Sequence, residues 1–182
     1  MSGSASGVHP FDLLLEIDRR SAGRYHADYD MLQVSERGGR LALRLGDWRL
    51  MFAMADVSEI IPLPRITRVP GVKPWFVGIA NLRGTVISIA DLQAFLMEKP
   101  TKLHPHGRVL ILRAGEWDCG VLMDEVIGMR HFGEEQQLPS LDGVEAPLRP
   151  YITAAYQADE QCWLAFDAPR LLRDAAFLAA AG

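Results

Sequence analysis

The chain has 182 residues, enough for one substantial domain or two small ones with a hydrophobic core. Hydrophobic residues make up 49% of the chain and charged residues 23%, which excludes a disordered protein. The net charge of −4 argues against a nucleic-acid partner, which usually selects a basic protein, and no apolar run approaches the roughly 20 residues of a membrane-spanning helix.

Residues 1–37 are predicted to form an N-terminal extension outside the main domain. Pro10 suits the first turn of a helix, where its missing N–H would have no partner anyway. Phe11 and Leu14 then fall on one face of a short amphipathic helix, which we expect to end near Ala22. The extension has no basic-then-apolar signal, so we expect a cytoplasmic protein.

The two cysteines, Cys119 and Cys162, are far apart in the sequence and form no CxxC pair. They fit a reducing compartment, in which a buried Cys acts as a small hydrophobic residue. Neither has a local His that would activate it, so both are interpreted as core residues.

A β-hairpin is predicted where the hydrophobic pattern takes a period of two. Leu41, Leu43 and Leu45 alternate with other residues, and a second alternating run follows the turn at Gly46-Asp47. The stretch 108–123 repeats this design around another turn that contains Gly. The repetition predicts two similar β subdomains.

Each predicted half also ends in the same way, with a strand that runs through an Asp into a short helix. The Asp residues are Asp91 and Asp167, whose carboxylates can cap the helix that follows. We therefore expect a first barrel mainly at 40–97, a linker at 98–107, a second barrel mainly at 108–167 and a C-terminal helix at 168–179.

The sequence contains no recognisable catalytic, cofactor or metal site. GxxxxGK[ST] and GxSxG are absent, and the close pair His104 and His106 has no nearby Cys or further His. The adjacent carboxylates Asp124 and Glu125 are expected to point to opposite faces of a strand, so they do not easily form one acid/base site. We interpret them as solvated surface charges. We predict no enzyme activity, cofactor or metal.

Glu59 and Arg83 are charged residues within strongly apolar stretches. An unpaired buried charge costs several kcal/mol, so the two are predicted to form a salt bridge. Gly84 is expected to provide the unusual backbone angle of a tight turn beside Arg83. The bridge could serve the fold alone or shape a surface that a partner contacts, and the sequence leaves both roles open.

Several segments together resemble the CheW family of bacterial chemotaxis coupling proteins. They are DVSEII, ITRVPGVKPWFVGIANLRGTVISIADL, GVLMDEVIGM and CWLAFDAPRLL, and the resemblance extends from about Leu41 to Leu178. The family motif is NLRG at Asn81, Leu82, Arg83 and Gly84. The VPGVKPW form and the N-terminal extension look most like the PilI-type branch, which serves twitching by type IV pili.

The resemblance implies a mainly β fold, with two SH3-like five-stranded barrels and short helices in a CheW-like domain at 38–179. It also implies a non-catalytic adaptor that joins the cytoplasmic tip of a chemoreceptor to a CheA-type histidine kinase, and that meets the membrane only through receptors. The positions that match the receptor-coupling region of the family are Val57, Glu59, Gly78 and Arg83. A groove between the barrels, lined by Ile60, Ile61 and parts of Val121 to Val126, is expected to receive receptor helices.

Two alternatives remain open. The chain could be a flagellar CheW paralogue, or a small β-barrel enzyme or ligand-binding protein, although the second would need a convergent set of titratable groups. One departure from the family pattern is Ser88, which stands in the strand after NLRG where family members often carry Pro.

Overall fold

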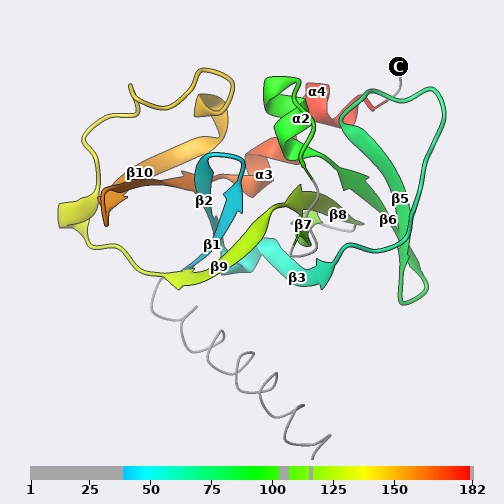
Figure 1. Cartoon of the computed structure of the whole chain (residues 1–182), viewed down its shortest axis with the longest axis horizontal. Helices are drawn as coiled ribbons and strands as arrows, with labels where there is room; N and C mark the ends of the chain where they lie inside the picture. The colour runs from blue at the N-terminus through cyan, green and yellow to red at the C-terminus, as the bar shows by residue number, and fades with distance from the viewer. Residues whose placement is uncertain (1–38, 103–106, 115–116, 181–182) are drawn as a thin grey trace, which may run out of the picture. The chain divides into compact units, whose positions relative to one another are not determined.

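The computed structural model describes residues 39–102, 107–114 and 117–180. The helix predicted in the N-terminal extension lies outside the described residues. Within them the chain is mainly β, as predicted, with a few short helices (Figure 1).

The strands are β1 (Arg40–Leu45), β2 (Trp48–Ala53), β3 (Val57–Pro62), β4 (Ile66–Thr67), β5 (Phe76–Leu82), β6 (Thr85–Ala90), β7 (Arg108–Ala114), β8 (Trp117–Met123), β9 (Glu125–Arg130), β10 (Ile152–Ala158) and β11 (Gln161–Phe166). The helices are α2 (Leu92–Met97), α3 (Ala168–Leu171) and α4 (Ala175–Leu178), with 3-10 turns η1 (Met54–Asp56), η2 (Glu134–Gln136) and η3 (Arg149–Tyr151).

The predicted hairpins are confirmed. Strands β1 and β2 pair antiparallel around Gly46, whose φ of 59° is the left-handed conformation that Gly adopts at low cost. Strands β5 and β6 form a second antiparallel hairpin, and β7 and β8 form a third. These elements are local, so alternating hydrophobicity and turn residues suffice to predict them.

The strands assemble into two mixed sheets. The five-stranded sheet has the order β10-β11-β2-β1-β9, and the six-stranded sheet has the order β3-β7-β8-β6-β5-β4. Each contains one parallel pair, β11 with β2 and β6 with β8. Figure 1 shows β10, β2 and β1 toward the left and β5 and β6 at the right.

The sheets correct the predicted barrel boundaries. The hairpin β1–β2 lies in the sheet that contains β9, β10 and β11, and the hairpin β7–β8 lies in the sheet that contains β3 to β6. The prediction that residues 40–97 and 108–167 form one barrel each is therefore wrong for these two hairpins. The repeat itself is present, but the two halves of the chain exchange their first hairpins. Pairing between hairpins is non-local, so strand patterns do not reveal it.

The ends of the two halves match in detail. The Asp91 carboxylate accepts a hydrogen bond from the Ala94 N–H at 3.0 Å, and the Asp167 carboxylate accepts one from the Arg170 N–H at 3.0 Å. Both predicted helix caps are thus confirmed. The backbone N–H groups of Asp91 and Asp167 each donate at 2.7 Å, to the carbonyls of Trp75 and Tyr151 respectively.

The single C-terminal helix predicted at 168–179 is instead two short helices, α3 and α4. Asp174 separates them, because its carboxylate accepts a hydrogen bond from the Ala176 N–H at 2.7 Å and caps α4. Asp in the interior of a helix competes with the backbone in this way, which the apolar pattern of the segment does not show.

A large central core joins the two sheets. It contains Leu43 of β1, Phe52 of β2, Leu110 of β7 and Phe166 of β11, all at most 2% exposed. A smaller cluster packs against the six-stranded sheet alone and another against the five-stranded sheet alone. Because the largest cluster draws side chains from both sheets, we expect residues 39–180 to unfold as one cooperative unit.

Candidate partner-binding site

The NLRG motif forms the tight turn between β5 and β6. Leu82 pairs with Thr85, so Arg83 and Gly84 are the two central residues of the turn. Their φ angles are 52° and 92°, the left-handed values that a two-residue hairpin turn requires at both positions. The Asn81 side-chain oxygen accepts a hydrogen bond from the Gly84 N–H at 2.9 Å and holds the turn closed. The sequence predicted the role of Gly84 but not the left-handed backbone of Arg83.

The predicted bridge between Glu59 and Arg83 is confirmed. The Arg83 Nη2 atom lies 2.5 Å from the Glu59 Oε1 atom, so β3 and the β5–β6 turn are joined across the sheet. The expected burial is wrong, because the side chain of Arg83 is 77% exposed and that of Glu59 is 31% exposed. Exposed ion pairs contribute about 0–1 kcal/mol, so the pair orients the guanidinium more than it stabilises the fold.

The remaining predicted site residues fall into two groups. Val57, Ile61 and Val121 are buried, with exposures of 8%, 6% and 0%, while Ile60 and Val126 are partly buried against the central core. Ile61 belongs to the cluster of the six-stranded sheet and Ile60 to the central core, so their side chains point to opposite faces of β3. Ile60 and Ile61 therefore cannot line one groove together. The contribution of the other predicted residues to partner binding stays a prediction.

Gly78 is required by packing. Its φ is 149°, and a Cβ atom at this position would lie 2.3 Å from the Thr67 carbonyl oxygen of β4. That distance is far inside van der Waals contact, so only Gly allows β4 to approach β5 here. Whether Gly78 also contributes to partner binding stays a prediction.

A polar network that the sequence reading missed ties β1 to the crossing between β8 and β9. The Asp124 carboxylate is 6% exposed and accepts hydrogen bonds from the Gly46 N–H at 2.6 Å and from Arg44 Nη1 at 3.3 Å. Arg44 Nε also lies 3.1 Å from a Glu125 carboxylate oxygen. Asp124 is thus a buried, paired residue rather than a solvated one.

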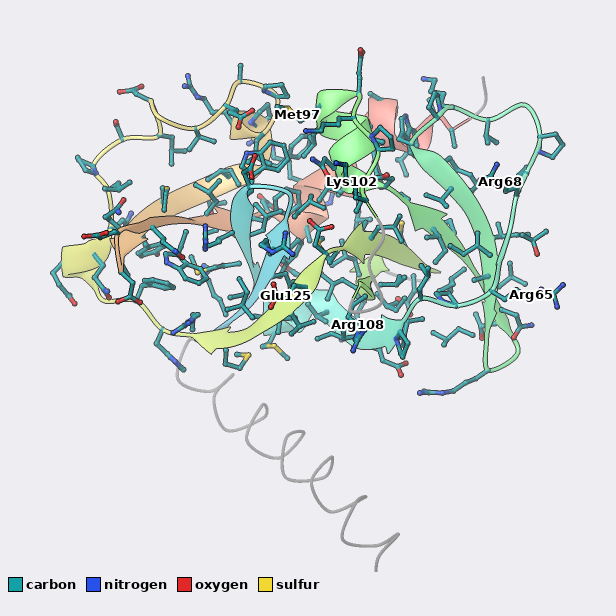
Figure 2. All side chains as sticks on the ribbon, viewed as in Figure 1. Arg65, Arg68, Met97, Lys102, Arg108 and Glu125 are labelled. Atoms are coloured by element: carbon teal, nitrogen blue, oxygen red, sulfur yellow. The ribbon has the colours of Figure 1, made fainter. Side chains whose placement is uncertain are left out.

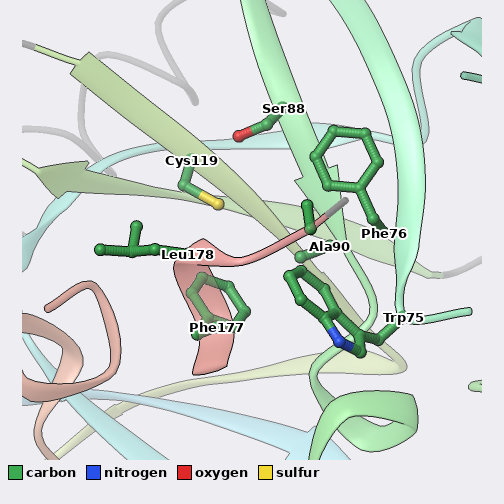
Figure 3. A pocket seen from close by; sticks show the side chains of 8 residues that line it. Trp75, Phe76, Ser88, Ala90, Cys119, Phe177 and Leu178 are labelled. Atoms are coloured by element: carbon green, nitrogen blue, oxygen red, sulfur yellow. The ribbon is translucent and has the colours of Figure 1, made fainter. Parts of the chain in front are cut away.

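An apolar pocket of about 190 Å³ opens beside the C-terminal residues (Figure 3). Trp75 and Phe177 stack there with ring centroids 5.1 Å apart, and Phe76 lies on the side of β5. Cys119 and Ser88 are the polar side chains that face the pocket. Burial raises the pKa of the Cys119 thiol to about 11, so it stays protonated and unreactive at neutral pH.

The other cysteine corrects a prediction. Cys162 is exposed at the start of β11, so only Cys119 is a core residue. Among the described residues, no three His, Cys, Asp or Glu side chains gather in a way that could hold a metal ion. In the same part of the chain, no helix has the length and apolar character needed to cross a membrane.

These features describe a β scaffold whose distinctive polar element is a charged, rigid turn on its surface. The model of the CheW-like domain matches residues 40–176, so the chain belongs to the CheW-like family, as the motifs predicted.

Among known relatives, the chain is 36% identical to protein PilI of Pseudomonas aeruginosa, over 93% of this chain and 94% of that one. It is 29% identical to protein FrzA of Myxococcus xanthus over 57% of this chain and 64% of that one. It is 24% identical to the chemotaxis protein CheW of Klebsiella aerogenes over 72% of this chain and 80% of that one.

The fold agrees with these similarities. The crystal structure of the scaffolding protein TtCheW from Thermoanaerobacter tengcongensis superposes with a TM-score of 0.66 at 18% identity, covering 77% of this chain and 90% of that one. At this identity the likeness establishes the fold and carries no assignment of partners.

Proposed function

We propose that the protein is a CheW-like adaptor that couples chemoreceptors to a CheA-type histidine kinase in a pathway controlling type IV pili. The observation that carries the proposal is the similarity to PilI over nearly the full length of both chains. The family match over residues 40–176 supports the adaptor role, and the similarity to FrzA and CheW proteins supports a motility pathway.

The geometry suggests how Arg83 takes part. A turn with two left-handed residues and a side-chain hydrogen bond has little freedom, so the backbone of Arg83 is held in one place, and the contact with Glu59 orients the guanidinium. Glu59 occupies one edge of the Arg83 guanidinium. Most of the Arg83 side chain stays accessible to a partner's carboxylate or backbone carbonyl. Such a protein couples its partners through binding alone, and many simultaneous contacts in an array of receptors raise the overall affinity.

Reconstitution tests the proposal. Membranes carrying a receptor from a pilus chemosensory system are mixed with its CheA-type kinase, with and without this protein, and kinase phosphorylation is measured. The protein is expected to place kinase activity under receptor control. An equal rate with and without the protein would refute coupling, and activity only with a flagellar receptor and kinase would move the protein to the flagellar branch.

Replacing Arg83 tests the site. Arg83→Ala is expected to lower ternary assembly at least tenfold while the unfolding midpoint changes little, because the ion pair is exposed. Arg173→Ala, which removes another exposed arginine from the segment between α3 and α4, is the matched control. Normal assembly by the folded Arg83→Ala protein would exclude Arg83 from the contact.

A further inference from the structure

The apolar pocket beside the C-terminal residues is separate from the NLRG turn and its salt bridge. It has a volume of about 190 Å³, and Leu178, whose side chain is 50% exposed, lies at its rim. Its walls are largely aromatic, with Trp75, Phe76 and Phe177 around the space in Figure 3. A cavity of about 150 Å³ with apolar walls is large enough to bind benzene, so this pocket has room for one aromatic ring with a small substituent.

The walls of the pocket are held in place by contacts within the protein. The rings of Trp75 and Phe177 stack with centroids 5.1 Å apart, and Phe95 packs edge-on against both at 5.4 and 5.1 Å. The Ala180 carbonyl accepts a hydrogen bond from the Lys73 N–H at 2.9 Å, which ties the end of the C-terminal segment to the chain just before β5. A ligand would therefore enter a space that is already formed and would lose little free energy to ordering its walls.

Two polar groups mark one end of the pocket. Ser88 of β6 and Cys119 of β8 lie opposite each other in a parallel pair, and both side chains face the space (Figure 3). The Ser88 hydroxyl donates a hydrogen bond to the Cys119 sulfur, and this sulfur lies 3.7 Å from the Gly120 carbonyl oxygen, to which the thiol donates. A hydroxyl that donates one hydrogen bond can still accept, so the Ser88 oxygen is available to a donor on a ligand.

The lining of the pocket is electrically neutral. All eight described residues that line it are uncharged at neutral pH, because burial raises the pKa of the Cys119 thiol to about 11. Arg65, in the connection between β3 and β5, is exposed and extends outward (Figure 2). An ion would lose its hydration in this pocket without gaining a partner of opposite charge, so the ligand that fits is neutral.

We propose that the pocket is a binding site for a small, neutral aromatic molecule that carries one hydrogen-bond donor, such as a phenol. The ring lies between the aromatic walls, where stacked and edge contacts are favourable, and the hydroxyl donates to the Ser88 oxygen. Water competes poorly, because a buried water needs about two to four polar partners and only one end of the pocket is polar. The bound ring contacts β5, β6 and β8 as well as α4, so it fixes the C-terminal segment on the six-stranded sheet.

Titration of the full chain with phenol, followed by amide chemical shifts in proton–nitrogen correlation spectra, tests the proposal. Phenol is expected to shift the amides of Ala90, Cys119 and Phe177 in a saturable way, with a dissociation constant of about 1 mM. It should also raise the unfolding midpoint, because it binds the folded state alone. The absence of saturable shifts up to about 10 mM phenol, or shifts confined to other parts of the chain, would overturn the proposal.

Substitutions at Ser88 locate the ligand within the pocket. Ser88→Ala should weaken phenol binding by about three- to tenfold, the effect of one hydrogen bond, and should leave the binding of toluene unchanged. Ser88→Leu fills the pocket and should abolish the binding of both probes. Thr85→Ala is the matched control, because it removes an exposed hydroxyl from the same strand outside the pocket, and it should bind like the wild type.

Two further results would exclude this site. One is an equal loss of phenol and toluene binding in Ser88→Ala, and the other is undiminished binding by Ser88→Leu that circular dichroism shows to be folded. The same phenol group occurs on a tyrosine side chain, so N-acetyltyrosinamide is titrated as well. Tighter binding of N-acetyltyrosinamide than of phenol would overturn the small-molecule site and assign the pocket to a partner's side chain. Because the measurement contains no receptor or kinase, its failure would leave the proposed adaptor function unaffected.

Discussion

Equivalent strands follow the same order in the two sheets, with β4 as an additional edge strand in the six-stranded one. The side chains that pack against the two sheets nevertheless differ. The cluster against the six-stranded sheet is aliphatic, with Ile87, Ile89 and Ile111 among its buried members. The cluster against the five-stranded sheet contains Trp163, over which Arg49 and Arg130 lie at 5.9 and 5.2 Å from the ring centroid. The two sheets therefore share a topology although their apolar side chains differ. Turns and caps require particular residues, whereas apolar positions accept different side chains of suitable volume.

The two capping aspartates show the same divergence. Asp91 is 5% exposed and accepts two further hydrogen bonds, from the N–H and the hydroxyl of Thr101, both at 2.7 Å. Asp167 is half-buried, and its cap of α3 is the only hydrogen bond recorded for its side chain within the described residues. In the first half the cap also holds the chain that leaves the helix, whereas in the second half it serves the helix alone.

The largest effect is expected from a cavity in the central core. Phe52→Ala should lower the free energy of unfolding by about 3–5 kcal/mol, because Phe52 is fully buried and packs on Phe166 with ring centroids 5.0 Å apart. Since this core joins both sheets, unfolding followed by tryptophan fluorescence and by far-ultraviolet circular dichroism should coincide at every urea concentration. Two separate transitions would show that the sheets are independent units.

The capping residues should differ in the size of their effect. Asp91→Ala should cost about 3 kcal/mol, because it also leaves the buried N–H and hydroxyl of Thr101 without their acceptor. Asp167→Ala should cost about 1 kcal/mol, as for an ordinary helix cap. Urea unfolding of both variants measures the difference. Equal losses would mean that the contacts of Thr101 add nothing, and Asp91→Asn separates the charge from the hydrogen bonds.

The smallest effect concerns pH and the last helix. The hydrogen bond from the Tyr151 hydroxyl, at 2.6 Å, and that from the Ala176 N–H hold the pKa of Asp174 below its ordinary value of 3.8. A lowered pKa stabilises the fold above the unfolded-state value, and this contribution is lost as the pH falls through the folded-state value. Asp174→Ala should therefore cost about 0.5 kcal/mol at pH 7, and less as the pH falls below 3.8.

Urea unfolding of the wild type and Asp174→Ala between pH 7 and pH 2 measures this dependence. A difference in stability that stays constant over this range would contradict it. Burial and the bond to Asp174 raise the pKa of Tyr151, so the Tyr151 hydroxyl keeps its proton throughout.

Local features of the fold could be predicted from the sequence. The three hairpins, the caps at Asp91 and Asp167, the turn at Gly84 and the pairing of Glu59 with Arg83 all followed from alternation, turn residues or the cost of an unpaired charge. The family followed from the NLRG motif with its flanking strands, and the match over residues 40–176 confirms it. The contribution of the predicted residues to partner binding stays a prediction.

Burial and non-local pairing could not be predicted in the same way. Arg83 was expected to be buried because its neighbours are apolar, but it occupies the tip of a hairpin, where the side chain extends into solvent. Asp124 was expected at the surface as one of two adjacent carboxylates that do not form an acid/base site, yet its side chain is buried where the chain crosses between sheets and accepts a hydrogen bond from the Gly46 N–H in the turn after β1. In both cases the environment comes from strands distant in the sequence.

By itself the sequence determined the hairpins and the two helix caps of this protein, its internal repeat and its family, because turns, caps and period-two patterns act within a few residues of the chain. Only the tertiary structure decided that the halves exchange their first hairpins and share one core, because strand pairing depends on contacts between distant segments.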